Sequence, residues 1–157
     1  MIRPHVVTGA FGYTGKYIAR RLLEVGSKVT TLTGHLESPN RFGKRLSTSP
    51  FNFDNPAALA RTLEGADTLF NTYWIRFAHG GINHDTAVEN LMTLISAAED
   101  AGVRRIVHLS ITNATLDSSL PCFRGKARVE DAIYQSSMSH AILSPTVIFG
   151  REDILRN

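Results

Sequence analysis

Short apolar runs rich in β-branched residues alternate along this chain with segments whose apolar residues recur at helical spacing. The first run, His5-Val6-Val7, has the pattern of a strand buried on both faces of a parallel sheet. Runs of the same character follow at intervals, bounded by glycine, asparagine, proline or serine, and predict further strands. The expected strands cover residues 5–7, 28–33, 51–53, 67–71, 105–110 and 141–143.

The segments between these strands predict helices. The first helix would end at Gly26 in a left-handed conformation, and a later one follows the strong start signal Asp54-Asn55-Pro56, in which Asp54 or Asn55 is the cap. The polar segment 34–50 is expected to be a loop. The expected helices include residues 17–25, 56–63, 88–98 and 124–135.

Strict alternation of strands and helices predicts an α/β fold. The expected architecture is a Rossmann-type, doubly wound parallel sheet of about six strands, with helices on both faces. Right-handed crossovers bring the carboxyl ends of all parallel strands to one edge. A ligand is therefore expected at that edge.

Composition excludes several classes of protein. The 157 residues have the length of one domain, and the net charge of +3 comes from scattered Lys and Arg, so nothing indicates nucleic-acid binding. The single cysteine, Cys122, excludes an intramolecular disulfide, and the histidines show no metal-ligand spacing, so no metal site is expected. No apolar stretch reaches the roughly 18 residues of a membrane span, and no signal peptide is evident. We expect a cytoplasmic protein that does not bind a membrane.

Candidate chemistry begins between the first strand and the first helix, in the segment Thr8-Gly9-Ala10-Phe11-Gly12-Tyr13-Thr14-Gly15. Gly9 would permit a tight turn, Gly12 would let backbone N–H groups approach a pyrophosphate, and Gly15 would let the helix lie close to the strand. A strand, a turn and a helix in this order favour a dinucleotide-binding loop over an ordinary glycine-rich turn. The residues expected to contact the cofactor here are Gly9, Phe11, Gly12, Tyr13, Thr14 and Gly15.

The spacing Thr-Gly-x-x-Gly-x-x-Gly resembles that of the extended and atypical short-chain dehydrogenases/reductases, which include sugar-nucleotide epimerases and NmrA-like proteins. The resemblance covers essentially the whole chain but only the N-terminal half of family members, which continue into a further strand and a substrate domain. It implies that residues 1–157 form one NAD(P)-binding domain that stops before those parts. Such a chain is either a gene fragment or a reduced protein that borrows the missing surface from a partner.

The end of the second strand bears on the choice of nicotinamide cofactor. The dinucleotide fingerprint places an Asp or Glu there, about 20 residues beyond the glycines, to hold the ribose hydroxyls. This chain has Gly34 and His35 instead, with Arg41, Lys44 and Arg45 nearby. Because no carboxylate repels a 2′-phosphate, NADP is favoured over NAD. The alternative is that these basic residues form a solvated face of a loop.

The resemblance implies further cofactor contacts after the later strands. Asp54 would meet the adenine amino group, and Thr72 and Tyr73 would lie beside the ribose and pyrophosphate. Family members usually carry small residues at the latter place, so the pair Tyr73-Trp74 either shapes a pocket or packs against the following loop. The stretch that matches the nicotinamide side of the cofactor is Pro145, Thr146 and Val147.

The resemblance also implies the catalytic residues. In the extended branch a Tyr-x-x-x-Lys pair, helped by a Ser or Thr after the fifth strand, moves the proton that accompanies hydride transfer. Here Lys126 is in register, but Cys122 stands at the tyrosine position, where a thiol is too short to reach a carbonyl placed for tyrosine. Ser110 and Thr112 are the candidate hydroxyls, Thr112 being the better match, unless each bonds its own backbone in a turn. Asn90 matches a proton-relay asparagine, or else satisfies neighbouring backbone groups.

Three interpretations of Cys122 stay open: a small buried hydrophobic residue, a weak substitute acid, or a sign that the chain only binds nucleotide. We therefore expect the NAD(P)-binding domain of an oxidoreductase or epimerase that is weak or inactive alone. Its full-length relatives would act on a sugar nucleotide or a small carbonyl compound. The alternative is a non-catalytic nucleotide-sensing or assembly protein, similar to NmrA-like regulators or to a respiratory complex I accessory subunit of this superfamily.

Overall fold

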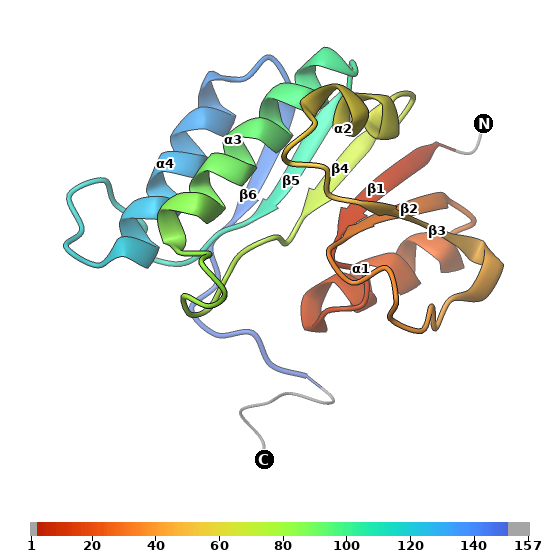
Figure 1. The fold of residues 1–157 in the computed structure, drawn as a ribbon, viewed down its shortest axis with the longest axis horizontal. Helices are drawn as coiled ribbons and strands as arrows, with labels where there is room; N and C mark the ends of the chain where they lie inside the picture. Colours follow the sequence, from red (N-terminus) through yellow and green to blue (C-terminus); the bar gives the residue numbers. More distant parts are fainter. Residues whose placement is uncertain (1–2, 151–157) are drawn as a thin grey trace.

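The structure is a computed structural model that describes residues 3–150. Its centre is a parallel sheet of six strands in the order β3-β2-β1-β4-β5-β6 (Figure 1). The strands are β1 (Pro4–Thr8), β2 (Lys28–Thr33), β3 (Leu46–Pro50), β4 (Thr68–Asn71), β5 (Arg105–Leu109) and β6 (Ser139–Leu143). The helices are α1 (Tyr13–Glu24), α2 (Pro56–Leu63), α3 (His84–Asp100) and α4 (Pro121–Gln135), with one 3-10 turn, η1 (Gly43–Arg45). The predicted doubly wound α/β fold is confirmed.

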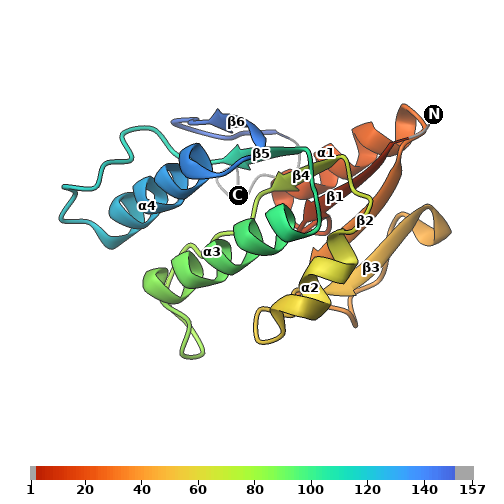
Figure 2. The same cartoon turned by 90° about the horizontal axis from the view of Figure 1, so that it is seen from above.

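Different helices cover the two faces of the sheet. Val6 of β1 belongs to the core under α2, α3 and α4, whereas Val7 belongs to the smaller core under α1, because side chains alternate along a strand. In the larger layer α3 lies between α2 and α4 (Figure 2). Leu91 and Leu94 of α3 and Ile106 of β5 are fully buried there. Because side chains alternate along β1, this one strand packs against the helices on both faces of the sheet.

The third strand is not where the sequence pattern predicts it. Residues 46–50 of the expected loop form β3, which pairs with β2 in the register Val29↔Leu46 to Thr33↔Pro50. As an edge strand it buries only Leu46, so its other residues can be polar. Phe51 and Phe53, the expected strand, instead stack on each other beyond its end, with ring centroids 4.8 Å apart.

Several other expected boundaries move by a few residues, among them the starts of α4 and β6. α4 begins at Pro121, ahead of the predicted start near residue 124, because proline fits the first turn of a helix, where its missing N–H is not needed. β6 begins at Ser139 rather than residue 141, and it too is an edge strand with mostly exposed side chains. Exposed edge strands therefore carry the weakest sequence signal in this fold.

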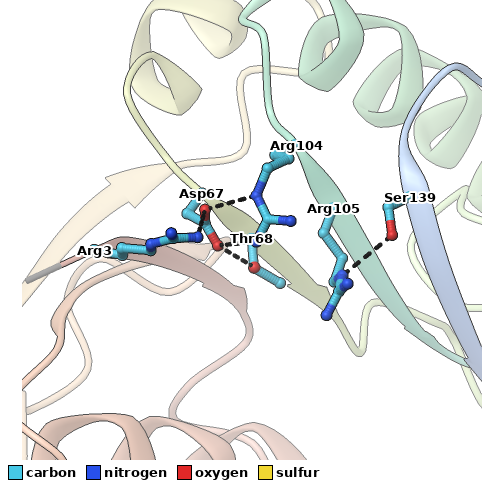
Figure 3. Close-up of polar contacts among 6 residues, drawn as sticks. All are labelled: Arg3, Asp67, Thr68, Arg104, Arg105 and Ser139. Carbon is cyan, nitrogen blue, oxygen red and sulfur yellow. Dashed lines mark hydrogen bonds and ion pairs between the residues drawn. The ribbon is translucent and has the colours of Figure 1, made fainter.

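An ion-pair cluster ties the strands together at their amino ends (Figure 3). Asp67, immediately before β4, accepts hydrogen bonds from Arg104 Nε and Nη2 at 2.9 and 3.1 Å and from Arg3 Nη1 at 2.9 Å. Thr68 Oγ1 donates a further bond to the same carboxylate at 2.9 Å. These donors, the Arg104 guanidinium foremost, hold the pKa of Asp67 well below its usual range.

Within residues 3–150 no helix is both long and apolar enough to cross a membrane. In the same part of the chain, no three His, Cys, Asp or Glu side chains are grouped so that they could hold a metal ion.

Asp67→Asn should lower the melting temperature at neutral pH, because a neutral amide cannot replace a carboxylate bound by two guanidinium groups. The effect should depend on pH. Since the folded-state pKa of Asp67 lies below its unfolded value of about 3.9, the stabilisation is fully present above that value and is lost as the pH falls below it.

Thermal unfolding of both proteins from neutral pH to about pH 3 checks this prediction. The difference in melting temperature should stay constant from neutral pH to about pH 5 and should shrink below about pH 4. A difference that does not shrink in the acidic part of this range would contradict the role given to Asp67.

Candidate functional site

The turn between β1 and α1 brings the helix onto the end of the strand. Gly9 adopts a φ of 68°, which glycine tolerates, and its N–H donates to Leu32 O of β2 at 2.8 Å. The N–H of Gly12 donates to Gly9 O at 2.9 Å, and Gly12 is the cap residue of α1. Gly15 lies so close to this turn that a Cβ there would stand 2.1 Å from Gly9 O. Only glycine fits at position 15 unless the helix or the turn moves.

The N-terminus of α1 is suited to an anion. Its first turn contains no acidic residue, and the cap residue offers no side chain to its N–H groups. The N–H groups of a first turn lack intrahelical acceptors, and the helix dipole adds a partial positive charge. A phosphate placed against this turn would be stabilised by both.

A cavity of about 560 Å³ opens beside this helix end, at the carboxyl ends of β1, β4 and β5; we call it the carboxyl-end cavity. Many predicted site residues come together in its wall: Gly9, Gly12, Tyr13, Thr14, Gly15, Thr72, Tyr73, Ser110, Cys122 and Lys126. The wall also contains Phe51, Trp74, Ile75, Arg76, Leu109, Ile111 and Ile148. Of these seven residues, only Trp74 was considered for the site from the sequence.

A buried polar network fixes the ends of β1 and β4 beneath the cavity. Thr8 Oγ1 accepts the backbone N–H groups of Thr72 and Tyr73 at 2.7 and 3.0 Å and donates to Asn71 Oδ1 at 3.1 Å. Asn71 Nδ2 in turn donates to His108 Nδ1 of β5 at 2.8 Å. Burial, helped by the nearby charge of Lys126, lowers the pKa of His108 to about 3, so this histidine is neutral at physiological pH.

Tyr73 packs at the cavity wall with the aromatic rings that follow β3. Its ring meets those of Phe51 and Phe53 edge-on, with centroids 5.1 and 5.2 Å apart. Its hydroxyl accepts a hydrogen bond from Asn90 Nδ2 at 2.9 Å. Asn90 therefore bonds this hydroxyl rather than the neighbouring backbone groups considered from the sequence.

Lys126, Cys122 and Trp74 form the wall contributed by α4 and the segment after β4. Lys126 is 3% exposed, and its Nζ donates to Leu109 O at 2.8 Å and lies 4.5 Å from the centroid of the Trp74 ring. Burial lowers the pKa of Lys126 to about 8. Cys122 Sγ accepts the indole N–H of Trp74 at 3.3 Å. The thiol is therefore engaged by the indole in the cavity wall.

Of the two candidate hydroxyls after β5, the structure places Ser110 at the cavity. Ser110 Oγ donates a hydrogen bond to Glu130, a residue the sequence pattern did not single out. Its spacing was a usable signal, because Glu130 follows Lys126 by one helical turn. Thr112 lies outside the cavity wall, where its N–H donates to Pro145 O at 3.1 Å.

The remaining predicted residues also lie outside this wall. Residues 145–147 do not line the cavity, although Ile148 does. Asp54 is exposed. Of the two residues predicted to cap α2, Asn55 is the cap and Asp54 is not, because Asn55 Oδ1 accepts the N–H of Ala58 at 3.1 Å. An asparagine directly before proline has the better position, since the cap residue precedes the first helical residue. His35 lines a separate cavity of about 560 Å³ at the carboxyl ends of β2 and β3.

A smaller cavity of about 350 Å³, here called the basic cavity, lies between α1 and the segment before β3. Phe11 of the glycine loop reaches it, as does one acidic residue, Glu24. Lys44 lies apart, at a different cavity. The cationic side chains of the basic cavity are Lys16, Arg20, Arg41 and Arg45.

Comparison with known proteins gives one family match and several relatives. A family model described as NAD(P)H-binding matches residues 9–153. The chain is 25% identical to the mitochondrial NADH dehydrogenase (ubiquinone) 1 alpha subcomplex subunit 9 of Rattus norvegicus, over 96% of this chain and 42% of that protein. It is 26% identical to the photosystem II assembly factor Ycf39 of Guillardia theta, over 86% of this chain and 43% of that protein. The chain spans less than half the length of these two relatives.

Solved structures share the fold. The Bordetella bronchiseptica enzyme WbmH in complex with NAD⁺ has a TM-score of 0.76 at 18% identity, covering 93% of this chain and 57% of that one. A wide-type short-chain dehydrogenase/reductase from Veillonella parvula in complex with NADP has a TM-score of 0.75 at 15% identity, covering 98% and 73%. Proteins of this fold thus include complexes with either dinucleotide.

Gly15→Ala should destabilise the folded chain by about 2 kcal/mol or more, because the new methyl group overlaps the backbone of the glycine turn. Gly34→Ala is the matched control, since a Cβ there would meet nothing nearer than Phe51 Cδ2 at 4.0 Å. Chemical denaturation of both variants measures the free energy of unfolding. Equal losses in the two variants would contradict the close approach at Gly15.

Proposed function

The chain belongs to the NAD(P)H-binding family, and from this premise we propose that its carboxyl-end cavity holds the dinucleotide and that NADP is preferred over NAD. The observation that carries the proposal is the contact between Gly15 and Gly9, which puts the open N-terminus of α1 in the wall of the cavity. The pyrophosphate would bind to the first-turn N–H groups of α1. Lys126 would hold a ribose hydroxyl with its ammonium group. When bound, the cofactor would supply or accept a hydride.

The preference for NADP is supported by charges at two places. Gly34 and His35 follow β2 where a carboxylate would hold the ribose of NAD, so neither of these two positions repels a 2′-phosphate. The basic cavity adjoins the glycine loop at Phe11 and presents four cationic side chains, Arg41 among them. A guanidinium binds a phosphate with paired hydrogen bonds, which a ribose hydroxyl cannot match.

We propose that the chain alone binds cofactor without efficient turnover. The expected acid is absent from position 122, and the thiol found there accepts a hydrogen bond from Trp74. Ser110 remains as a hydroxyl at the cavity wall. A sugar nucleotide or a small carbonyl compound is the proposed substrate class of the longer proteins that share this domain.

A second candidate function is that of a nucleotide-binding accessory or assembly protein. Two relatives favour it by their names, a subunit of NADH dehydrogenase and a photosystem II assembly factor. The thiol of Cys122, which stands at the tyrosine position and accepts the indole N–H of Trp74, also favours a non-catalytic function. The two candidates differ in whether a longer protein that contains this domain consumes bound NADPH when a panel of aldehydes and ketones is added.

Isothermal titration calorimetry with NADPH and with NADH tests the proposal. NADPH should bind about tenfold more tightly, as expected of a charge-assisted hydrogen bond worth about 1.5 kcal/mol or more. Arg41→Gln should reduce this ratio several-fold. Lys44→Gln is the matched control, because it removes the same charge from the same segment outside the basic cavity.

Absence of saturable binding by either nucleotide would refute the cofactor site. Tighter binding of NADH would overturn the preference while leaving the site intact. Equal effects of Arg41→Gln and Lys44→Gln would show that the basic cavity does not read the 2′-phosphate.

A further inference from the structure

Lys126 is a buried cation with spare hydrogen-bond donors. Its side chain is 3% exposed, yet among the described residues it makes one hydrogen bond, to Leu109 O. An ammonium has three N–H donors, so two remain for a ligand. Because Lys126 lines the carboxyl-end cavity, a ligand in that cavity can reach it. A buried ammonium with so few polar partners needs another source of stabilisation.

The Trp74 ring provides that source. Lys126 Nζ lies 4.5 Å from the centroid of the ring, within the range of a cation–π interaction. The ring is held in place because its N–H donates to Cys122 Sγ at 3.3 Å. It also rests against α4 at Gly125, where a Cβ would stand 3.0 Å from Trp74 Cη2 and 3.1 Å from Val88 Cγ2. The glycine therefore lets the indole lie directly on the helix.

The titratable groups around Lys126 and the Trp74 ring come from three elements. Burial lowers its pKa to about 8, and the opposing influences are Cys122 and Glu130, both on α4. From β5, His108 faces it but is neutral over the working range of pH, since its pKa is about 3. From α3, His84 lies against the indole with ring centroids 5.8 Å apart. Small changes in these surroundings decide whether Lys126 is charged near neutral pH.

We propose that Trp74 is a positioning residue for dinucleotide binding: its ring holds the Lys126 ammonium charged and in the wall of the carboxyl-end cavity. This inference rests on the proposed function of that cavity. The dinucleotide is an anion, so an ammonium attracts it and donates to it, whereas a neutral amine does so far less. Replacing the ring by an aliphatic side chain of similar burial removes the cation–π attraction without admitting bulk water. The neutral amine is then favoured at a lower pH.

The experiment is the pH dependence of the dissociation constant for NADPH, measured by fluorescence titration from about pH 6.5 to about pH 9.5. In the wild type, affinity should fall as the pH rises through about 8. In Trp74→Leu the midpoint should move down by about 0.5–1.5 pH units, which is a cation–π energy of about 0.5–2 kcal/mol converted to pH. At about pH 8, where the wild-type ammonium is half protonated, that variant should bind several-fold more weakly.

Three further variants sharpen the comparison. Trp74→Phe keeps a smaller ring and should shift the midpoint in the same direction by less, which keeps the test decisive if Trp74→Leu does not fold. Lys126→Arg stays charged throughout this pH range, so it should remove the transition near pH 8. Any pH dependence that comes from NADPH itself would appear in this variant as well as in the wild type. Cys122→Ala removes the thiol, and the downward shift caused by Trp74→Leu should persist in that background.

Coincident midpoints for the wild type and both Trp74 variants, or a wild-type profile as flat as that of Lys126→Arg, would overturn the inference. Neither result would contradict the proposed cofactor site, because NADPH binding would still be measured. Absence of NADPH binding at every pH would instead refute the proposed function itself.

Discussion

The contact between Gly15 and Gly9 is the constraint on which the site depends. It lets the first turn of α1 lie against the end of β1, with no side chain between the two backbones. The hydrogen bond from Gly9 N–H to Leu32 O fixes the same turn to β2. The position of the helix end relative to β1 and β2 follows from these contacts. A wall of backbone donors is thus placed at the sheet edge, where parallel α/β folds bind their ligands.

The other residues of the cavity and of the layer beneath it have different structural roles. Thr8, Asn71 and His108 form a buried hydrogen-bonded network that aligns the ends of β1, β4 and β5. Lys126 is the buried charge that faces the ligand space, and Trp74 lies over it. This arrangement provides for anion binding far better than for proton transfer, since the hydroxyl expected at position 122 is replaced by a thiol that accepts a hydrogen bond from Trp74.

Where sequence reasoning succeeded, local pattern and global fold agreed. Apolar runs buried on both faces, such as β1 and β5, and the glycine spacing of the first turn have few alternative explanations. The prediction of the third strand was wrong because the edge strand β3 buries only Leu46, so its polar residues have the pattern of a loop. Phe51 and Phe53 have the pattern of a strand but stack on each other beyond its end. Contacts across the chain, such as Trp74 with Cys122, leave no local signal because they depend on how α4 packs beside the segment after β4.

Trp74 is the single tryptophan of the chain and lies in the wall of the carboxyl-end cavity, so its fluorescence reports directly on that cavity. The most direct test of the central claim is energy transfer from Trp74 to the reduced nicotinamide ring during titration with NADPH. Saturable loss of tryptophan emission, with matching sensitised emission from NADPH, is predicted. NADPH binding detected by calorimetry with no change in the emission of Trp74 would place the dinucleotide elsewhere and contradict the account.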